Sequence, residues 1–188
     1  MSGKPIPTCS SVRDLGVTVT PDLHPRLHIL DVLSRAGRVA NFILRAFGSK
    51  IPAVYLTAYR ALVLPIVLYA CEAWRPWNKK DILSIEKLQN RFVIRVALRC
   101  GISRDDIHIP SVTDLFDARD RRLTYVLLRH RYFSDFFVFQ DSITRARYRA
   151  VIPRARNNTV SESVRWRLVR LLNGDLHDLI VNTTSSIN

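Results

Sequence analysis

The stretch NKKDILSIEKLQNRFVIRVALR, residues 78–99, decides the fold class of this chain. Its apolar residues recur every three or four positions, the spacing that places side chains on one face of an α-helix. The predicted core face consists of Ile82, Ile85, Leu88, Phe92 and Val96. Asn78 is a typical N-cap residue, and Gly101 follows where helices commonly end. We therefore expect a long amphipathic helix here.

Three other stretches show similar patterns. Residues 26–47 predict a helix that ends before Gly48, with a core face of Ile29, Leu33, Ala36, Ala40, Ile43 and Phe47. A further helix is expected from near Ser111, and a weaker one covers residues 161–180, with an interruption at Asn173 and Gly174. These periodicities favour a helical bundle.

A second helix is expected to begin at Pro52, because proline fits the first turn of a helix. It runs toward Trp74 and should kink at Pro65, because proline disrupts a helix interior. Four of its residues have helical spacing and are expected to face the helices before and after it: Tyr59, Leu62, Ile66 and Tyr69. This predicts a buried helix.

The predicted fold class is mostly α, a bundle of about four main helices with a short N-terminal β-strand and a looser C-terminal helix. The strand falls within residues 12–20, where Leu15, Val17 and Val19 alternate with small or polar residues. We expect a junction segment at residues 1–11 and a helical domain at 12–140. A basic linker follows at 141–160, and a C-terminal helix and tail at 161–188.

The chain is strongly basic, with 29 Lys and Arg against 16 Asp and Glu and a formal net charge of +13. Most of the cations are arginine. Since the planar guanidinium binds phosphate oxygens in pairs and stacks on bases, this surplus favours a nucleic-acid partner. A scattered basic surface without a specific partner is the alternative.

Two basic helical faces are the candidate nucleic-acid-binding sites. One, at four-residue intervals in the helix at 78–99, is formed by Lys87, Arg91, Arg95 and Arg99. The other, in the helix at 26–47, is formed by Arg35, Arg38 and Arg45. Like charges at this spacing destabilise a helix by about 0.2–0.5 kcal/mol per pair, so an anionic partner would relieve repulsion. Gly37 would allow a phosphate backbone to approach closely. The alternative is a solvated helical face.

No pattern predicts catalysis, a metal, a cofactor or a small-molecule substrate. Asp105 and Asp106 are adjacent carboxylates, but a third is absent nearby, and a loop-capping role suffices for them. Pro25 lies between His24 and His28 and argues against a metal-binding helical face. The three cysteines, at positions 9, 71 and 100, have no paired spacing.

The sequence also argues against a membrane protein and against secretion. The uncharged run at residues 61–71 is shorter than the roughly 20 residues that span a bilayer. Residues 1–11 contain no apolar core of signal-peptide length. We therefore expect an intracellular protein, in the nucleus or the cytoplasm.

Four blocks of residues, in order along residues 12–137, resemble the region that follows the palm in reverse transcriptases of non-LTR retrotransposons, the LINE-type and jockey-like elements. The first block contains Arg13, Asp14, Leu15, Gly16, Val17, Leu23 and His28. The second contains Tyr59, Leu62, Val63, Leu64, Pro65, Ile66, Tyr69 and Trp74. The third contains Ile82, Ile85, Glu86, Gln89, Asn90, Arg91, Phe92 and Arg95. The fourth contains Asp106, Ile107, His108, Ile109, Pro110, Val112, Leu128 and His130.

This resemblance implies a thumb-like helical domain of an RNA-directed DNA polymerase, which grips the primer–template duplex behind the active site. In that family the metal-binding aspartates precede the segment that resembles residues 15–17. We therefore expect a non-catalytic C-terminal fragment without the palm. The implied partners are an RNA/DNA duplex or hybrid, held through its phosphates by the two basic faces, and a separate or missing palm domain.

Three alternatives to nucleic-acid binding stay open at the level of sequence. The chain is a helical protein-interaction domain whose exposed apolar faces belong against a palm, a remnant without independent activity, or a membrane-associated protein anchored through residues 51–74.

Overall fold

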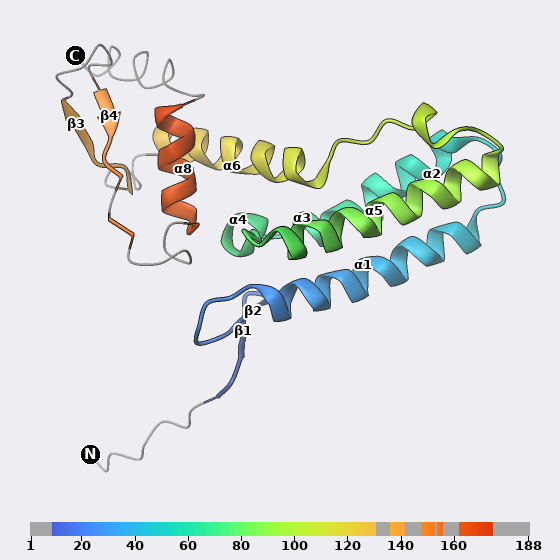
Figure 1. The fold of residues 1–188 in the computed structure, drawn as a ribbon, viewed down its shortest axis with the longest axis horizontal. Coiled ribbons are helices and arrows are strands. Elements are labelled where there is room, and N and C mark those ends of the chain that lie inside the picture. The colour runs from blue at the N-terminus through green and yellow to red at the C-terminus, as the bar shows by residue number, and fades with distance from the viewer. Residues whose placement is uncertain (1–8, 131–135, 142–147, 153, 156–161, 175–188) are drawn as a thin grey trace. The chain divides into compact units, whose positions relative to one another are not determined.

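The computed structural model describes residues 9–130, 136–141, 148–152, 154–155 and 162–174, and it is mostly helical (Figure 1). The predicted mostly-α fold class is confirmed. Contacts within the chain divide it into two compact units, residues 1–113 and 114–188. The domain boundaries inferred from the sequence stay predictions.

The first unit is built around two long helices, α1 (Arg26–Ala46) and α5 (Lys79–Cys100), which pack against each other (Figure 1). A segmented helix packs on both and consists of α2 (Pro52–Ala58), the π-helix η1 (Tyr59–Val63) and α3 (Leu64–Leu68). The short helix α4 (Cys71–Trp74) follows. Residues buried between these helices include Ile29, Ala36, Ile43, Tyr55, Tyr59, Val63, Val67, Ile85, Phe92 and Val96.

Helix α5 agrees with its prediction at both ends. The Asn78 side chain accepts a hydrogen bond from the Lys80 N–H at 3.0 Å, which satisfies one free donor of the first turn. Gly101 ends the helix in the left-handed conformation, with φ of 70°. Ile85, Phe92 and Val96 are buried, whereas Ile82 and Leu88 are half-buried at the edges of the apolar face.

The expected burial of the second helix was wrong at two of its four positions. Leu62 is 48% exposed and Tyr69 is exposed, while Val63 is fully buried. The residues that turn inward recur every four positions instead: Tyr55, Tyr59, Val63, Val67 and Cys71. A regular α-helix turns every 3.6 residues, so a four-residue repeat drifts around it.

The π-helix η1 offsets this drift. The Leu64 N–H bonds the carbonyl of Tyr59, five residues back, and the wide turn takes up one extra residue. It lies immediately before Pro65, whose ring and missing N–H are incompatible with a continuous α-helix. The disruption expected at Pro65 therefore takes the form of a π-turn.

The N-terminal strand is a hairpin rather than a single strand. Strands β1 (Val12–Asp14) and β2 (Val17–Val19) pair in antiparallel fashion, with Val12 opposite Val19. Leu15 and Gly16 form the turn, with φ of 45° and 84°. The Tyr69 hydroxyl donates to the Leu15 carbonyl at 2.9 Å and links the turn to the end of α3. Alternation of apolar residues does not reveal such a reversal.

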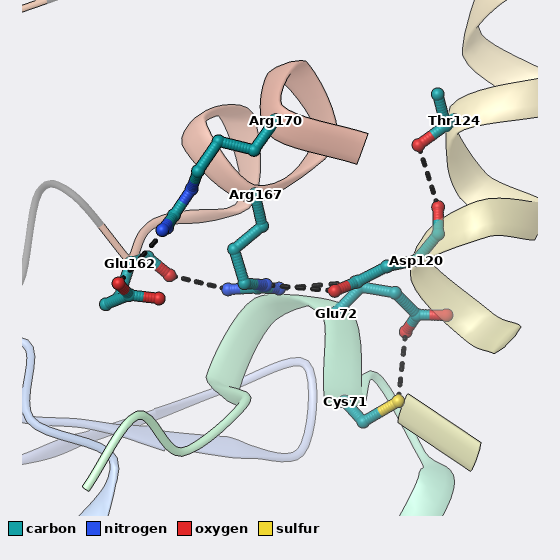
Figure 2. Close-up of polar contacts among 7 residues, drawn as sticks. All are labelled: Cys71, Glu72, Asp120, Thr124, Glu162, Arg167 and Arg170. Atoms are coloured by element: carbon teal, nitrogen blue, oxygen red, sulfur yellow. Dashed lines mark hydrogen bonds and ion pairs between the residues drawn. The ribbon is translucent and has the colours of Figure 1, made fainter. Parts of the chain in front are cut away.

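The second unit contains most of α6 (Val112–Arg129), strands β3 (Phe139–Asp141) and β4 (Tyr148–Ala150), and α8 (Val164–Asn173). Its core includes Leu127, Phe137, Ala150, Leu168, Val169 and Leu172. Figure 2 shows a buried ion pair in which Arg167 Nε lies 3.0 Å from Asp120 Oδ2. Strand β4 lies within the stretch expected to be a linker, and the Asn173 side chain bonds both backbone groups of Ala150.

Candidate nucleic-acid interface

The two predicted basic faces line one groove in the first unit, between α1 and α5. The groove consists of two adjoining hollows of about 820 and 390 Å³, which share Asn41, Leu44 and Arg95. We call it the α1–α5 groove. Its cationic lining residues are Arg38, Arg45, Lys50, Lys87, Arg91, Arg95 and Arg99.

Six of the seven predicted binding residues therefore lie along the same groove, and Arg35 is the exception. Arg35 pairs with Asp31 at 3.0 Å and does not line either hollow. Arg35 lies three residues before Arg38 on a neighbouring part of α1, and its ion pair with Asp31 distinguishes it from Arg38.

Four cations of the groove stand without protein partners. Among the described residues, none forms a hydrogen bond or ion pair with Arg38, Arg45, Lys87 or Arg91. The groove lining contains neither Asp nor Glu. Glu86, the nearest acidic neighbour in sequence, accepts a hydrogen bond from the Val112 N–H at 2.8 Å instead. The groove therefore concentrates uncompensated positive charge, which attracts an anion.

Arg99 also has a structural role within the protein. Its guanidinium donates to the carbonyls of Leu44 and Phe47 at the end of α1 and lies 6.0 Å from the centre of the Tyr55 ring. The last carbonyls of a helix lack partners within the helix, so Arg99 satisfies them. Arg99 thus holds the end of α1 against α5, and sequence reasoning missed this because the contact joins residues far apart in the chain.

Two other cations of the groove also form hydrogen bonds within the protein. The Lys50 ammonium donates to the Arg99 carbonyl in the last turn of α5, at 2.9 Å. Arg95 donates to the Asn41 side-chain oxygen at 2.7 Å, across the groove. Asn41 is neutral, so the positive charge of Arg95 stays uncompensated, and its guanidinium has further N–H donors for a ligand. Asn41 and Lys50 are lining residues that the charge pattern did not identify.

Gly37 lies in the wall of the groove. A Cβ added there would lie 3.7 Å from Leu88 Cδ1, an ordinary contact distance. Packing therefore does not require glycine at this position, although glycine inside a helix costs about 0.5–1 kcal/mol relative to alanine. Its presence is consistent with the predicted close approach of a ligand.

The other candidate residues have structural roles. Asp106 accepts from the Ser103 N–H at 3.2 Å and caps the short helix η2 (Arg104–Asp106), so the predicted capping role is confirmed. His28 is buried, accepts from the Thr18 N–H at 3.2 Å and packs on Trp74. Burial lowers the pKa of His28. The described residues include no group of three or more potential ligands that could hold a metal ion.

Trp74 is a packing residue. It is buried and donates from Nε1 to the Tyr69 carbonyl at 2.8 Å. Trp77 lies with its ring centre 5.1 Å from that of His24. In the part of the chain that the structure describes, no helix is long and apolar enough to cross a membrane.

Comparison with known proteins gives one weak relation. An uncharacterized protein from Caenorhabditis elegans is 30% identical over 94 residues, which cover 50% of this chain and 48% of that protein. The chain thus spans about half the length of this curated relative. No family model matches the chain, and no solved structure matches it.

Proposed function

We propose that the chain binds the phosphate backbone of a nucleic-acid duplex or hybrid through the α1–α5 groove. In this proposal it is the thumb-like region of a non-LTR retrotransposon reverse transcriptase, acts inside the cell, in the nucleus or the cytoplasm, and performs no catalysis by itself. The main support is the groove, because two basic faces far apart in sequence meet there with four unpaired cations and no acidic lining residue.

Phosphate contacts of this kind position a duplex without reading its sequence. The lining offers arginine and lysine donors and one asparagine. Such a surface suits a polymerase product, whose sequence varies. The resemblance of four sequence blocks to the post-palm region supports the same assignment.

The salt dependence of binding tests the proposal. Each phosphate contact adds about 0.9 to the slope of log affinity against log salt on duplex DNA. Changing Arg38, Lys87 and Arg91 to Gln removes three unpaired cations from the groove. We expect this triple variant to lose up to about 2–3 units of slope.

A matched control removes three cations from other surfaces of the same unit. Arg60, Lys79 and Lys80 are exposed and do not line the groove. Their change to Gln alters net charge by the same amount, and we expect the slope to fall by less than about one unit. Equal losses in the two variants would mean that net charge alone drives binding, and would contradict the proposal.

A second candidate function, a protein-interaction domain, is favoured by two exposed leucines. Leu15 and Leu23 are 85% and 63% exposed, and both have positive φ, which is uncommon for residues with a side chain. Strain and exposure together at these positions suggest a contact surface. If this were the main function, substitutions in the groove would leave partner binding unchanged.

A further inference from the structure

We propose that the α1–α5 groove takes nucleic acid with unpaired nucleotides, and that Phe42 is the platform on which an unpaired base stacks. This inference rests on the proposed function and narrows its ligand from duplex in general to a duplex with a single-stranded extension. Phe42 lies on α1 beside the lining residues Arg38 and Arg45, but it lines neither hollow itself, and it is 57% exposed. Among the described residues, its ring contacts no other aromatic ring.

The position of Phe42 on the helix supports this role. It follows Arg38 by four residues and precedes Arg45 by three, so the three side chains project from the same side of α1. At a rise of 1.5 Å per residue, the two arginines lie about 6 Å and about 4.5 Å from Phe42 along the helix axis. An aromatic ring between two unpaired guanidinium groups offers a stacking surface for a base and donors for the adjoining phosphates.

The opposite wall of the groove is also partly apolar. Leu98 of α5 lines the larger hollow and is 77% exposed. Ile94 of the same helix is exposed as well, outside the lining of the two hollows. A closed duplex presents charged backbone and hides the faces of its bases, so it would leave these apolar groups uncovered. A strand with unpaired bases covers both the apolar groups and the cations.

Phe42 is the aromatic residue best placed for stacking in the described part of the first unit. Trp74 is buried, and Trp77 lies against His24. Phe47 packs edge-on against Tyr55, with ring centres 6.3 Å apart. Stacking on an aromatic side chain tolerates any base, because every base has a π-face. The platform therefore fits a protein that does not read sequence.

Two nucleic acids and three variants test the inference. Binding of a blunt duplex is compared with binding of the same duplex carrying a short 5′ extension, for Phe42→Ala, Phe42→Trp and the control Leu27→Ala. Leu27 is exposed on the same helix but lies near its start, more than two turns before Arg38. We expect Phe42→Ala to weaken binding of the extended duplex by about 5- to 150-fold and of the blunt duplex by less than about twofold.

Phe42→Trp should restore binding of the extended duplex, because tryptophan keeps the stacking surface, and Leu27→Ala should have no effect on either ligand. If Phe42→Ala weakened the binding of both duplexes equally, the stacking role would be overturned and the proposed function would stay intact. Failure of the unmodified chain to bind either ligand would overturn the proposed function itself.

An anionic membrane surface would also attract cations interleaved with apolar groups. Vesicles of phosphatidylcholine with phosphatidylserine therefore serve as a third ligand. Vesicle binding that is lost in Phe42→Ala, with unchanged binding of the extended duplex, would overturn the inference and assign Phe42 to a lipid surface. Absence of vesicle binding, with selective loss of the extended duplex, supports it.

Discussion

Adjacent residues of the π-turn should lose very different amounts of stability on the same substitution. Val63 is fully buried, whereas Leu62 is 48% exposed. Val63→Asp loses about 1.5–3 kcal/mol of apolar burial and adds the cost of an unpaired buried carboxylate, which brings the loss above about 4 kcal/mol. Leu62→Asp gives up about half of a leucine's burial and keeps its carboxylate in water, so its loss should stay below about 1.5 kcal/mol.

The measurement is urea unfolding followed by far-ultraviolet circular dichroism, since the chain is mostly helical. Domains of this size have about 5–15 kcal/mol of stability, so Val63→Asp should be unfolded or nearly so without denaturant. Leu62→Asp should keep its helical signal, with a small decrease in midpoint. A folded Val63→Asp variant, or an unfolded Leu62→Asp variant, would show that the extra residue of the π-turn is not where the structure has it.

Three further predictions concern other parts of the chain. Arg167→Met removes the ion-pair partner of the buried Asp120 carboxylate and should cost about 3–5 kcal/mol by urea unfolding, whereas Arg167→Met with Asp120→Leu should recover most of the loss. Burial holds the pKa of His28 below 6.5, so the unfolded chain binds a proton on this imidazole more readily than the folded chain does. The stability of the chain should therefore fall as the pH decreases below about 6.5, and this fall should be weaker in His28→Gln. Gly37→Ala should raise stability by about 0.5–1 kcal/mol, with weaker duplex binding if the backbone passes close to the groove wall; unchanged binding would refute that approach.

The local features of the fold were predictable from the sequence. The caps and apolar face of α5 follow from Asn78, Gly101 and a regular spacing, because each depends on residues within one or two turns. The burial of Leu62 was mispredicted, because a 3.6-residue repeat was extended through a segment that contains a π-turn. The cause, Pro65, is visible in the sequence, but the form of the disruption depends on packing against α1 and α5.

The sequence predicted most residues of the candidate site, but it did not predict the contacts that each of them makes within the protein. The basic spacing selected six residues that do line the groove. It did not distinguish Arg35, which pairs with Asp31, or Arg99, which caps the end of α1. The pair of Arg35 with Asp31 lies within one helix, at an i,i+4 spacing that is visible in the sequence. The role of Arg99 depends on which helix lies beside which, and charge patterning contains no information on that.

Apart from Arg95, which bonds Asn41, the cations of the groove fall into two groups that have different physical explanations. Arg45, Lys50 and Arg99 lie at the ends of α1 and α5, where unpaired carbonyls and the helix dipole favour positive charge without any ligand. Arg38, Lys87 and Arg91 lie within the helices, where nothing in the described structure compensates them. Neutralising this second group should raise the stability of the free chain, since repulsion between like charges is relieved. If this variant gains stability and loses binding, the three cations serve ligand binding and not the stability of the fold.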